Sequence, residues 1–134
     1  MTPSILDTDI LSEFLRDNPK VVANVDEYLK EYGFVNLSII TYYEILNGLL
    51  YRDAKNLLSK FELFIKLSNV IPLTLPMAKV AAEIQAELKK TGMEIGHTDT
   101  LIAGIALVSK LQLVTNNTVH FQRIKKLSIA NWTK

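Results

Sequence analysis

The sequence predicts an α/β fold in which a parallel sheet is covered by helices on both faces. Short apolar segments of strand length alternate with segments of helical length along the whole chain. The 134 residues have the size of one domain, and 49% of them are hydrophobic, which suffices for one core. No linker, internal repeat or low-complexity segment interrupts the pattern. We therefore expect residues 1–134 to form a single domain.

The elements of the first half follow from apolar runs and from residues that begin or end helices. Ser4-Ile5-Leu6 is a short apolar run typical of a buried strand, and Thr8-Asp9 is a pair that opens a helix. Pro19 suits the first turn of a helix and Gly33 suits a helix end. The elements expected here are a strand at 4–6, helices at 8–16 and 19–32, a strand at 34–37, and helices at about 40–50 and 53–67.

The second half continues the alternation. Pro72 restricts its strand to a sheet edge or a strand end, because proline lacks the backbone N–H that an inner strand donates. The segment 99–109 is apolar on all sides, which predicts a buried helix. The elements expected here are a strand at 70–73, helices at 76–90 and 99–109, a strand at 111–114, a helix at about 117–124 and a strand at 127–129.

The composition restricts the kind of metal site that the chain could build. Cysteine is absent, and histidine occurs only as His97 and His120, which disfavours a zinc site of nitrogen and sulfur ligands. A metal would be held mainly by oxygen, and carboxylates suit Mg²⁺ or Mn²⁺. The N-terminus lacks the pattern of a signal peptide, and no uncharged run approaches the ~18 residues of a membrane span, so we expect a cytoplasmic protein.

Charge is distributed unevenly along the chain. Residues 1–99 hold all 14 acidic residues and 10 of the 15 Lys and Arg, a net charge of −4. Residues 100–134 hold five bases and no acid, a net charge of +5. Such an asymmetry is typical of proteins with a polyanionic partner, although a solvated basic face would produce the same count.

Three acidic residues lie in apolar or strand-end contexts. Asp7 directly follows the first strand, where ligands bind in open α/β sheets, although it could also cap the next helix. Glu44 lies between apolar residues of a helix. It is either a buried carboxylate that needs a partner or a metal, or a residue at the edge of the apolar face. Gly48, one turn later, suggests a close approach to the helix backbone. Asp99 opens the most apolar helix, where the helix dipole favours its charge and where it could cap the helix.

Together these three carboxylates predict a site for phosphodiester hydrolysis. Clustered acids repel one another until a cation neutralises them, and the cation then activates a water and stabilises charge on phosphate oxygens.

A polar segment follows the strand at 111–114 and should reach the same edge of the sheet. Thr115 could donate a hydrogen bond to a carboxylate such as Asp7, and Asn117 could bind a metal-bound water or a phosphate oxygen. His120 could contact the phosphate or leaving group, or titrate near neutral pH, or lie on the surface. We interpret Asn116 as a turn residue.

The motifs together resemble those of a family. They are LDTDIL (6–11), TYYEILNG (41–48), GHTDTLIA (96–103), VTNNTVHF (114–121) and the terminal ANW (130–132). Over nearly the whole chain the sequence resembles a PIN-domain ribonuclease, specifically the VapC-type toxin of a toxin–antitoxin pair. The resemblance implies a three-layer α/β/α sandwich with four or five parallel strands. It also implies Mg²⁺- or Mn²⁺-dependent cleavage of structured RNA such as tRNA or rRNA, a cognate antitoxin as partner, and a homodimer.

Motif by motif, the resemblance makes Asp7, Glu44 and Asp99 the metal-binding acids, with Thr115 orienting Asp7. Many relatives carry a fourth acid where this chain has Asn117 or His120. Three acids make one metal ion credible and leave the number of ions open.

Two other hypotheses fit parts of the sequence. The missing fourth acid would suit a PIN-like module that binds RNA or protein without cutting. The pair Asp7 and Asp9 resembles the Asp-x-Asp of haloacid-dehalogenase-like phosphatases, but no acid follows Asp99 to complete that site.

Overall fold

The structure is a computed structural model that describes all 134 residues. The chain folds in the order β1 (Ser4–Leu6), α1 (Thr8–Leu15), α2 (Pro19–Tyr32), β2 (Asn36–Ser38), α3 (Ile39–Tyr51), α4 (Lys55–Lys66), β3 (Asn69–Ile71), α5 (Leu75–Lys90), α6 (His97–Val108), β4 (Gln112–Val114), α7 (Thr118–Phe121) and β5 (Ile129–Ala130). None of these helices combines the length and the apolar character that crossing a membrane requires.

The five strands form one parallel sheet in the order β3-β2-β1-β4-β5. Strand β1 is central, with Ile5 opposite Asn36 of β2 on one side and Leu113 of β4 on the other. The chain first builds outward from β1 to β3 and later returns to add β4 and β5 on the other side. The sheet therefore reverses its strand order at β1, and such a reversal opens a crevice at the carboxyl ends of the strands.

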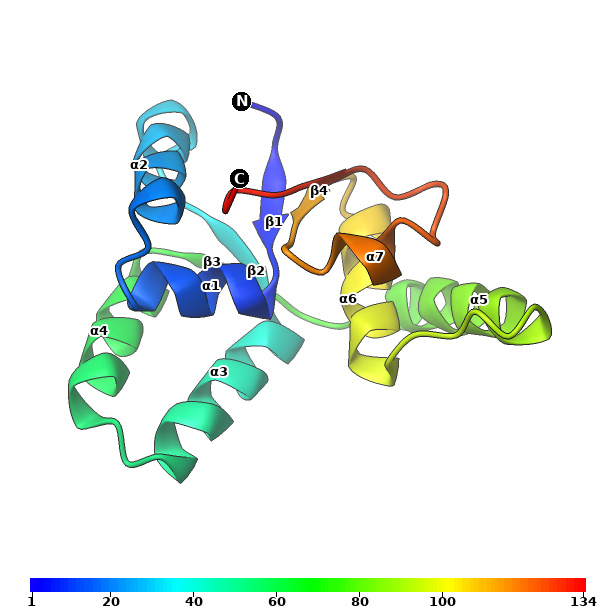
Figure 1. The fold of residues 1–134 in the computed structure, drawn as a ribbon, viewed down its shortest axis with the longest axis horizontal. Coiled ribbons are helices and arrows are strands. Elements are labelled where there is room, and N and C mark those ends of the chain that lie inside the picture. Colours follow the sequence, from blue (N-terminus) through cyan, green and yellow to red (C-terminus); the bar gives the residue numbers. More distant parts are fainter.

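Helices cover both faces of the sheet, as Figure 1 shows with α1, α2 and α4 on one side of the strands and α5, α6 and α7 on the other. The alternation of side chains along the strands explains both layers. Ile5 and Leu113 are buried in the core beneath α5, α6 and α7, whereas their neighbours Leu6 and Val114 are buried against α1 and α2. A third apolar cluster joins α1 to α3 and α4. The predicted three-layer α/β/α sandwich is confirmed.

Several predicted boundaries shift. Strand β3 ends at Ile71, so Pro72 lies just beyond an edge strand, as its missing donor requires. Helix α4 begins only at Lys55, because Asp53 has a left-handed backbone with φ of 52°. Helix α6 begins at His97 rather than at Asp99, and α7 is limited to Thr118–Phe121.

The close approach predicted at Gly48 is wrong, and the close approach occurs at Gly104. A Cβ atom added at Gly48 would meet nothing within 4 Å. A Cβ at Gly104 would lie 2.5 Å from the backbone oxygen of Met77 and 3.1 Å from the Cβ of Ala81. Gly104 therefore allows α6 to pack directly on the backbone of α5 in the core.

Candidate metal centre at the carboxyl ends of the strands

The polar side chains that the sequence singles out meet at the carboxyl ends of β1 and β4. Asp7 directly follows β1, and Thr115 directly follows β4, the strand that pairs with β1. The first turns of α1 and α6 bring Asp9 and Asp99 to this region, and Glu44 reaches it from α3. Four acids thus lie where the strand order reverses, and we call the region of Asp7, Asp9, Glu44 and Asp99 the acidic crevice.

Asp7 is the most buried acid of the chain, with 4% of its surface exposed. Its Oδ1 accepts a hydrogen bond of 2.8 Å from the backbone N–H of Thr8, which makes Asp7 the N-cap of α1. Its Oδ2 accepts a hydrogen bond of 2.7 Å from the hydroxyl of Thr115, as predicted. The capping role is therefore real, and it fixes the carboxylate at the crevice. Burial, reinforced by the negative charge of Asp9, raises the pKa of Asp7 to about 7.

Asp9 also belongs to this cluster, and the sequence analysis missed it. Its Oδ2 accepts a hydrogen bond of 3.0 Å from the backbone N–H of Asn116, in the turn after β4. Its Oδ1 is buried and has no hydrogen-bond partner. Burial raises the pKa of Asp9, and the charge of Asp99 raises it further. The available signal was the Asp-x-Asp spacing at a helix start, which we had considered only for a cap or for a phosphatase.

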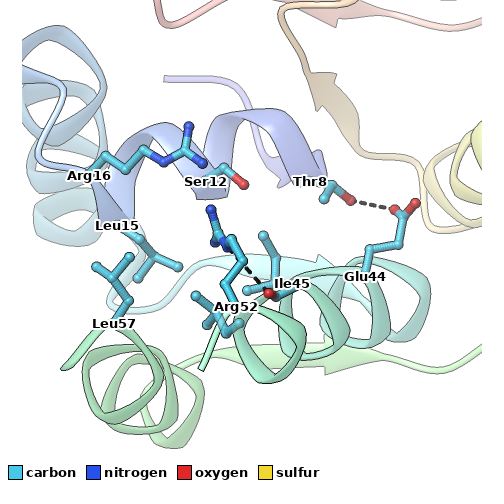
Figure 2. Close-up of a pocket in the computed structure, with 10 residues that line it drawn as sticks. Thr8, Ser12, Leu15, Arg16, Glu44, Ile45, Arg52 and Leu57 are labelled. Carbon is cyan, nitrogen blue, oxygen red and sulfur yellow. Dashed lines mark hydrogen bonds between the residues drawn. The ribbon is translucent and has the colours of Figure 1, made fainter. Parts of the chain in front are cut away.

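Glu44 is half-buried and tied to α1. Its Oε1 accepts a hydrogen bond of 2.7 Å from the hydroxyl of Thr8, visible in Figure 2, and the Oγ1 atoms of Thr8 and Thr41 lie 3.0 Å apart. This bond links the start of α1 to α3 across the crevice. It also gives the Glu44 carboxylate a partner other than a metal. The position of Glu44 is therefore compatible both with a metal ligand and with a residue at the edge of the apolar face.

Asp99 does not cap its helix. The N-cap of α6 is Gly96, and no side chain makes a capping hydrogen bond there. Asp99 is half-buried in the first turn, where burial raises its pKa, the charge of Glu44 raises it further and His120 lowers it. The carboxylates of Asp99 and Glu44 therefore interact electrostatically across the crevice.

The polar segment after β4 connects the two sides of the site. The Oγ1 of Thr115 accepts a hydrogen bond of 2.9 Å from the backbone N–H of Asn117, while its own proton goes to Asp7. The Asn117 side-chain nitrogen lies 3.0 Å from Nδ1 of His120 and 3.5 Å from Oδ2 of Asp99. Asn116 is a turn residue, as predicted, whose side chain accepts from Asn131 near the C-terminus. Asn117 and His120 thus face Asp99.

The donor set fits a hard divalent cation, although no three of these acids and histidines are arranged closely enough to enclose one as they stand. Three carboxyls with raised pKa and one orphaned carboxylate oxygen are costly in a crevice without a counter-charge. A cation would remove that cost. The ligands would be oxygens, supplied by Asp7, Asp9, Glu44 and Asp99, which suits Mg²⁺ or Mn²⁺ better than zinc.

Comparison with known proteins gives matches over nearly the whole chain. The family model described as PIN domain matches residues 4–127. Ribonuclease VapC2 of Rickettsia felis is 30% identical over 131 residues, covering 97% of this chain and 98% of the relative. The tRNA(fMet)-specific endonuclease VapC of Shigella flexneri is 28% identical over 134 residues, covering 99% and 100%.

Solved structures show the same similarity. The crystal structure of VapBC2 from Rickettsia felis, bound to a DNA fragment from their promoter, superposes with a TM-score of 0.86 at 28% identity, covering 96% of this chain and 98% of that chain. VapBC-1 from nontypeable Haemophilus influenzae gives a TM-score of 0.85 at 30% identity, covering 98% of each chain.

Proposed function

Because the chain belongs to the PIN-domain family, and within it resembles the VapC ribonucleases over nearly its whole length, we propose that it is a metal-dependent endoribonuclease and the toxin of a toxin–antitoxin pair. The observation that carries the proposal is the crevice itself. It gathers acids from three helices and one strand end, and burial there favours the neutral form of Asp7, Asp9 and Asp99. No Lys or Arg forms a salt bridge with these acids, so a bound cation would supply the missing counter-charge.

We assign Asp7, Glu44 and Asp99 to Mg²⁺ or Mn²⁺, and we add Asp9 as a fourth carboxylate. When bound, the cation would lower the pKa of a water molecule and stabilise charge on the scissile phosphate. Thr115 orients Asp7 through the hydrogen bond to Oδ2. Asp9 compensates for the acid that many relatives carry after β4. Asn117 and His120 face Asp99 and would contact phosphate oxygens or the leaving group.

The substrate class and partners are proposed from the relatives and from charge. Two relatives are tRNA(fMet)-specific endonucleases, from Shigella flexneri and Salmonella typhimurium, which favours tRNA as a structured substrate, with rRNA as the alternative. The five bases of residues 100–134 would hold the RNA backbone beside the acidic crevice. The solved relatives are VapBC complexes, which favours a VapB-type antitoxin as partner. A homodimer stays a prediction.

The test is cleavage of a mixture of tRNA and rRNA with Mg²⁺ or Mn²⁺, comparing wild type with Asp7→Ala. Asp26→Ala, which removes an exposed aspartate of α2, is the matched control. We expect cleavage by wild type and the control and its loss in Asp7→Ala. Equal cleavage by all three proteins would remove the proposed site. No cleavage by wild type across a broad RNA set would favour a PIN domain that binds without cutting.

A further inference from the structure

A small pocket lies between α1 and α3, directly beside the acidic crevice. It has a volume of about 80 Å³ and shares Thr8 and Glu44 with the candidate metal centre. The other lining residues are Ser12, Leu15, Arg16, Ile45, Gly48, Leu49, Arg52 and Leu57. Figure 2 shows the bond between Thr8 and Glu44 at one end of the pocket and the side chains of Arg16 and Arg52 toward the other. The pocket therefore runs from an acidic end to a basic end.

The two arginines at the basic end have no acidic partner. Neither forms a salt bridge, and the only side-chain hydrogen bond of either is 3.3 Å long, from Nε of Arg52 to the backbone oxygen of Gly48. That bond uses one donor of Arg52 and leaves the terminal nitrogens free. Ser12, which lies beside both arginines in Figure 2, has a hydroxyl drawn without a hydrogen bond to the other residues of the pocket. Two guanidinium groups and a hydroxyl thus face one small volume.

We propose that this end of the pocket binds a backbone phosphate of the RNA, next to the phosphate held at the acidic centre. The inference rests on the proposed function, because it assumes that RNA occupies the centre. Guanidinium groups bind phosphate oxygens through paired, charge-assisted hydrogen bonds. Leu15, Ile45 and Leu49 form the buried floor of the pocket, and the exposed guanidinium groups of Arg16 and Arg52 remain accessible to a phosphate from solvent.

The position of the pocket favours RNA over an acidic side chain of a protein partner. A polynucleotide strand that places one phosphate at the metal centre must place further phosphates along its path. The acids of the centre repel those phosphates, so cations beside the centre are needed to hold the strand. Arg16 and Arg52 supply them in the same pocket that Glu44 lines. A protein carboxylate has no comparable reason to lie beside an acidic crevice.

The test is binding of fluorescein-labelled bulk tRNA, followed by anisotropy in EDTA so that no cleavage occurs, over a range of salt concentrations. The variant is Arg16→Gln with Arg52→Gln. Both side chains are exposed and unpaired, so the fold should persist, and a thermal melt checks this. Lys30→Gln, which removes one exposed cation of α2 outside the pocket, is the control for loss of a positive charge elsewhere on the surface.

We expect the double variant to bind tRNA about tenfold more weakly than wild type, and the slope of log affinity against log salt to fall by about 1, the effect of one lost phosphate contact. Lys30→Gln should change neither quantity by as much. Lysine at both positions should restore the slope but not the full affinity, because an ammonium lacks the paired donors of arginine.

An unchanged slope and affinity in the double variant, or an equal loss in Lys30→Gln, would overturn the phosphate site. Unchanged tRNA binding together with weaker binding of the purified antitoxin would overturn it in favour of a carboxylate of the protein partner. Wild type that binds tRNA with the expected slopes but never cleaves it would refute the proposed nuclease and leave the phosphate site standing. Wild type that does not bind tRNA would refute both.

Discussion

Replacing Asp7 by Asn should stabilise the metal-free protein at alkaline pH. Asn retains the ability to cap α1, since Asn and Asp are about equally good N-caps, and it removes a buried charge. Its side-chain oxygen can accept from the backbone of Thr8, and its amide can donate to the hydroxyl of Thr115. The variant should therefore keep the local structure and lose only the cost of ionising a carboxyl that is 4% exposed.

The magnitude follows from the raised pKa. Folding raises the pKa of Asp7 from 3.8 to about 7, so the folded state binds the proton more tightly than the unfolded state. The resulting stability is fully present below pH 3.8 and is lost as the pH rises through about 7. Between pH 5 and pH 8 the wild type should lose about 3 kcal/mol from this group, at about 1.4 kcal/mol for each pKa unit.

The assay is urea unfolding in EDTA at pH 5 and pH 8 for wild type and Asp7→Asn, with Asp26→Asn as the control at an exposed aspartate. Relative to wild type, Asp7→Asn should gain about 3 kcal/mol in unfolding free energy between the two pH values. The control should follow the wild type. If Asp7→Asn also follows the wild type, the ionisation of Asp7 does not change between pH 5 and pH 8 without a metal, and a pKa of about 7 is refuted.

Three further predictions follow from contacts in the core and the crevice. Gly104→Ala should lose about 1–3 kcal/mol of unfolding free energy, because its Cβ would meet a backbone oxygen of α5. Gly48→Ala should gain about 0.5–1 kcal/mol, because its Cβ would meet open space. Urea unfolding that ranks the two variants the other way would contradict the packing. Thr115→Val removes the hydroxyl that stabilises the Asp7 carboxylate. The acidic limb of the pH–rate profile for RNA cleavage should therefore move up by about 1 pH unit. An unmoved limb would refute this role of Thr115. His120→Ala should lower the cleavage rate less than Asp7→Ala, and an equal loss would make the histidine essential.

The sequence predicts the centre of the site well because its position depends on strand ends. Asp7 and Thr115 each follow a short apolar run, and parallel neighbouring strands bring their carboxyl ends together. Their hydrogen bond was therefore foreseeable without coordinates. The alternation of Ile5 and Leu6 between the two cores likewise follows from strand geometry.

The parts that sequence reasoning missed depend on where helices begin and on which backbones meet. Asp9 escaped notice because its place at a helix start was interpreted as a cap or as part of a phosphatase motif. Only the fold shows that its side chain reaches the backbone N–H of Asn116 after β4. Asp99 does not cap its helix, as one interpretation expected, because α6 begins two residues earlier, at His97. Nothing local distinguishes Gly48, which is open, from Gly104, which packs on α5, because the difference lies in another helix.

The central claim is that acids at the carboxyl ends of the strands hold a metal ion that cuts RNA. Its most direct test is the rate of tRNA cleavage as Mn²⁺ is added to metal-free protein, for wild type and for Asp99→Asn, whose side chain caps nothing. We predict no cleavage in EDTA, saturable activation of the wild type by Mn²⁺, and little or no activation of Asp99→Asn at the same concentrations. Cleavage by wild type in EDTA, or equal activation of both proteins, would contradict the claim.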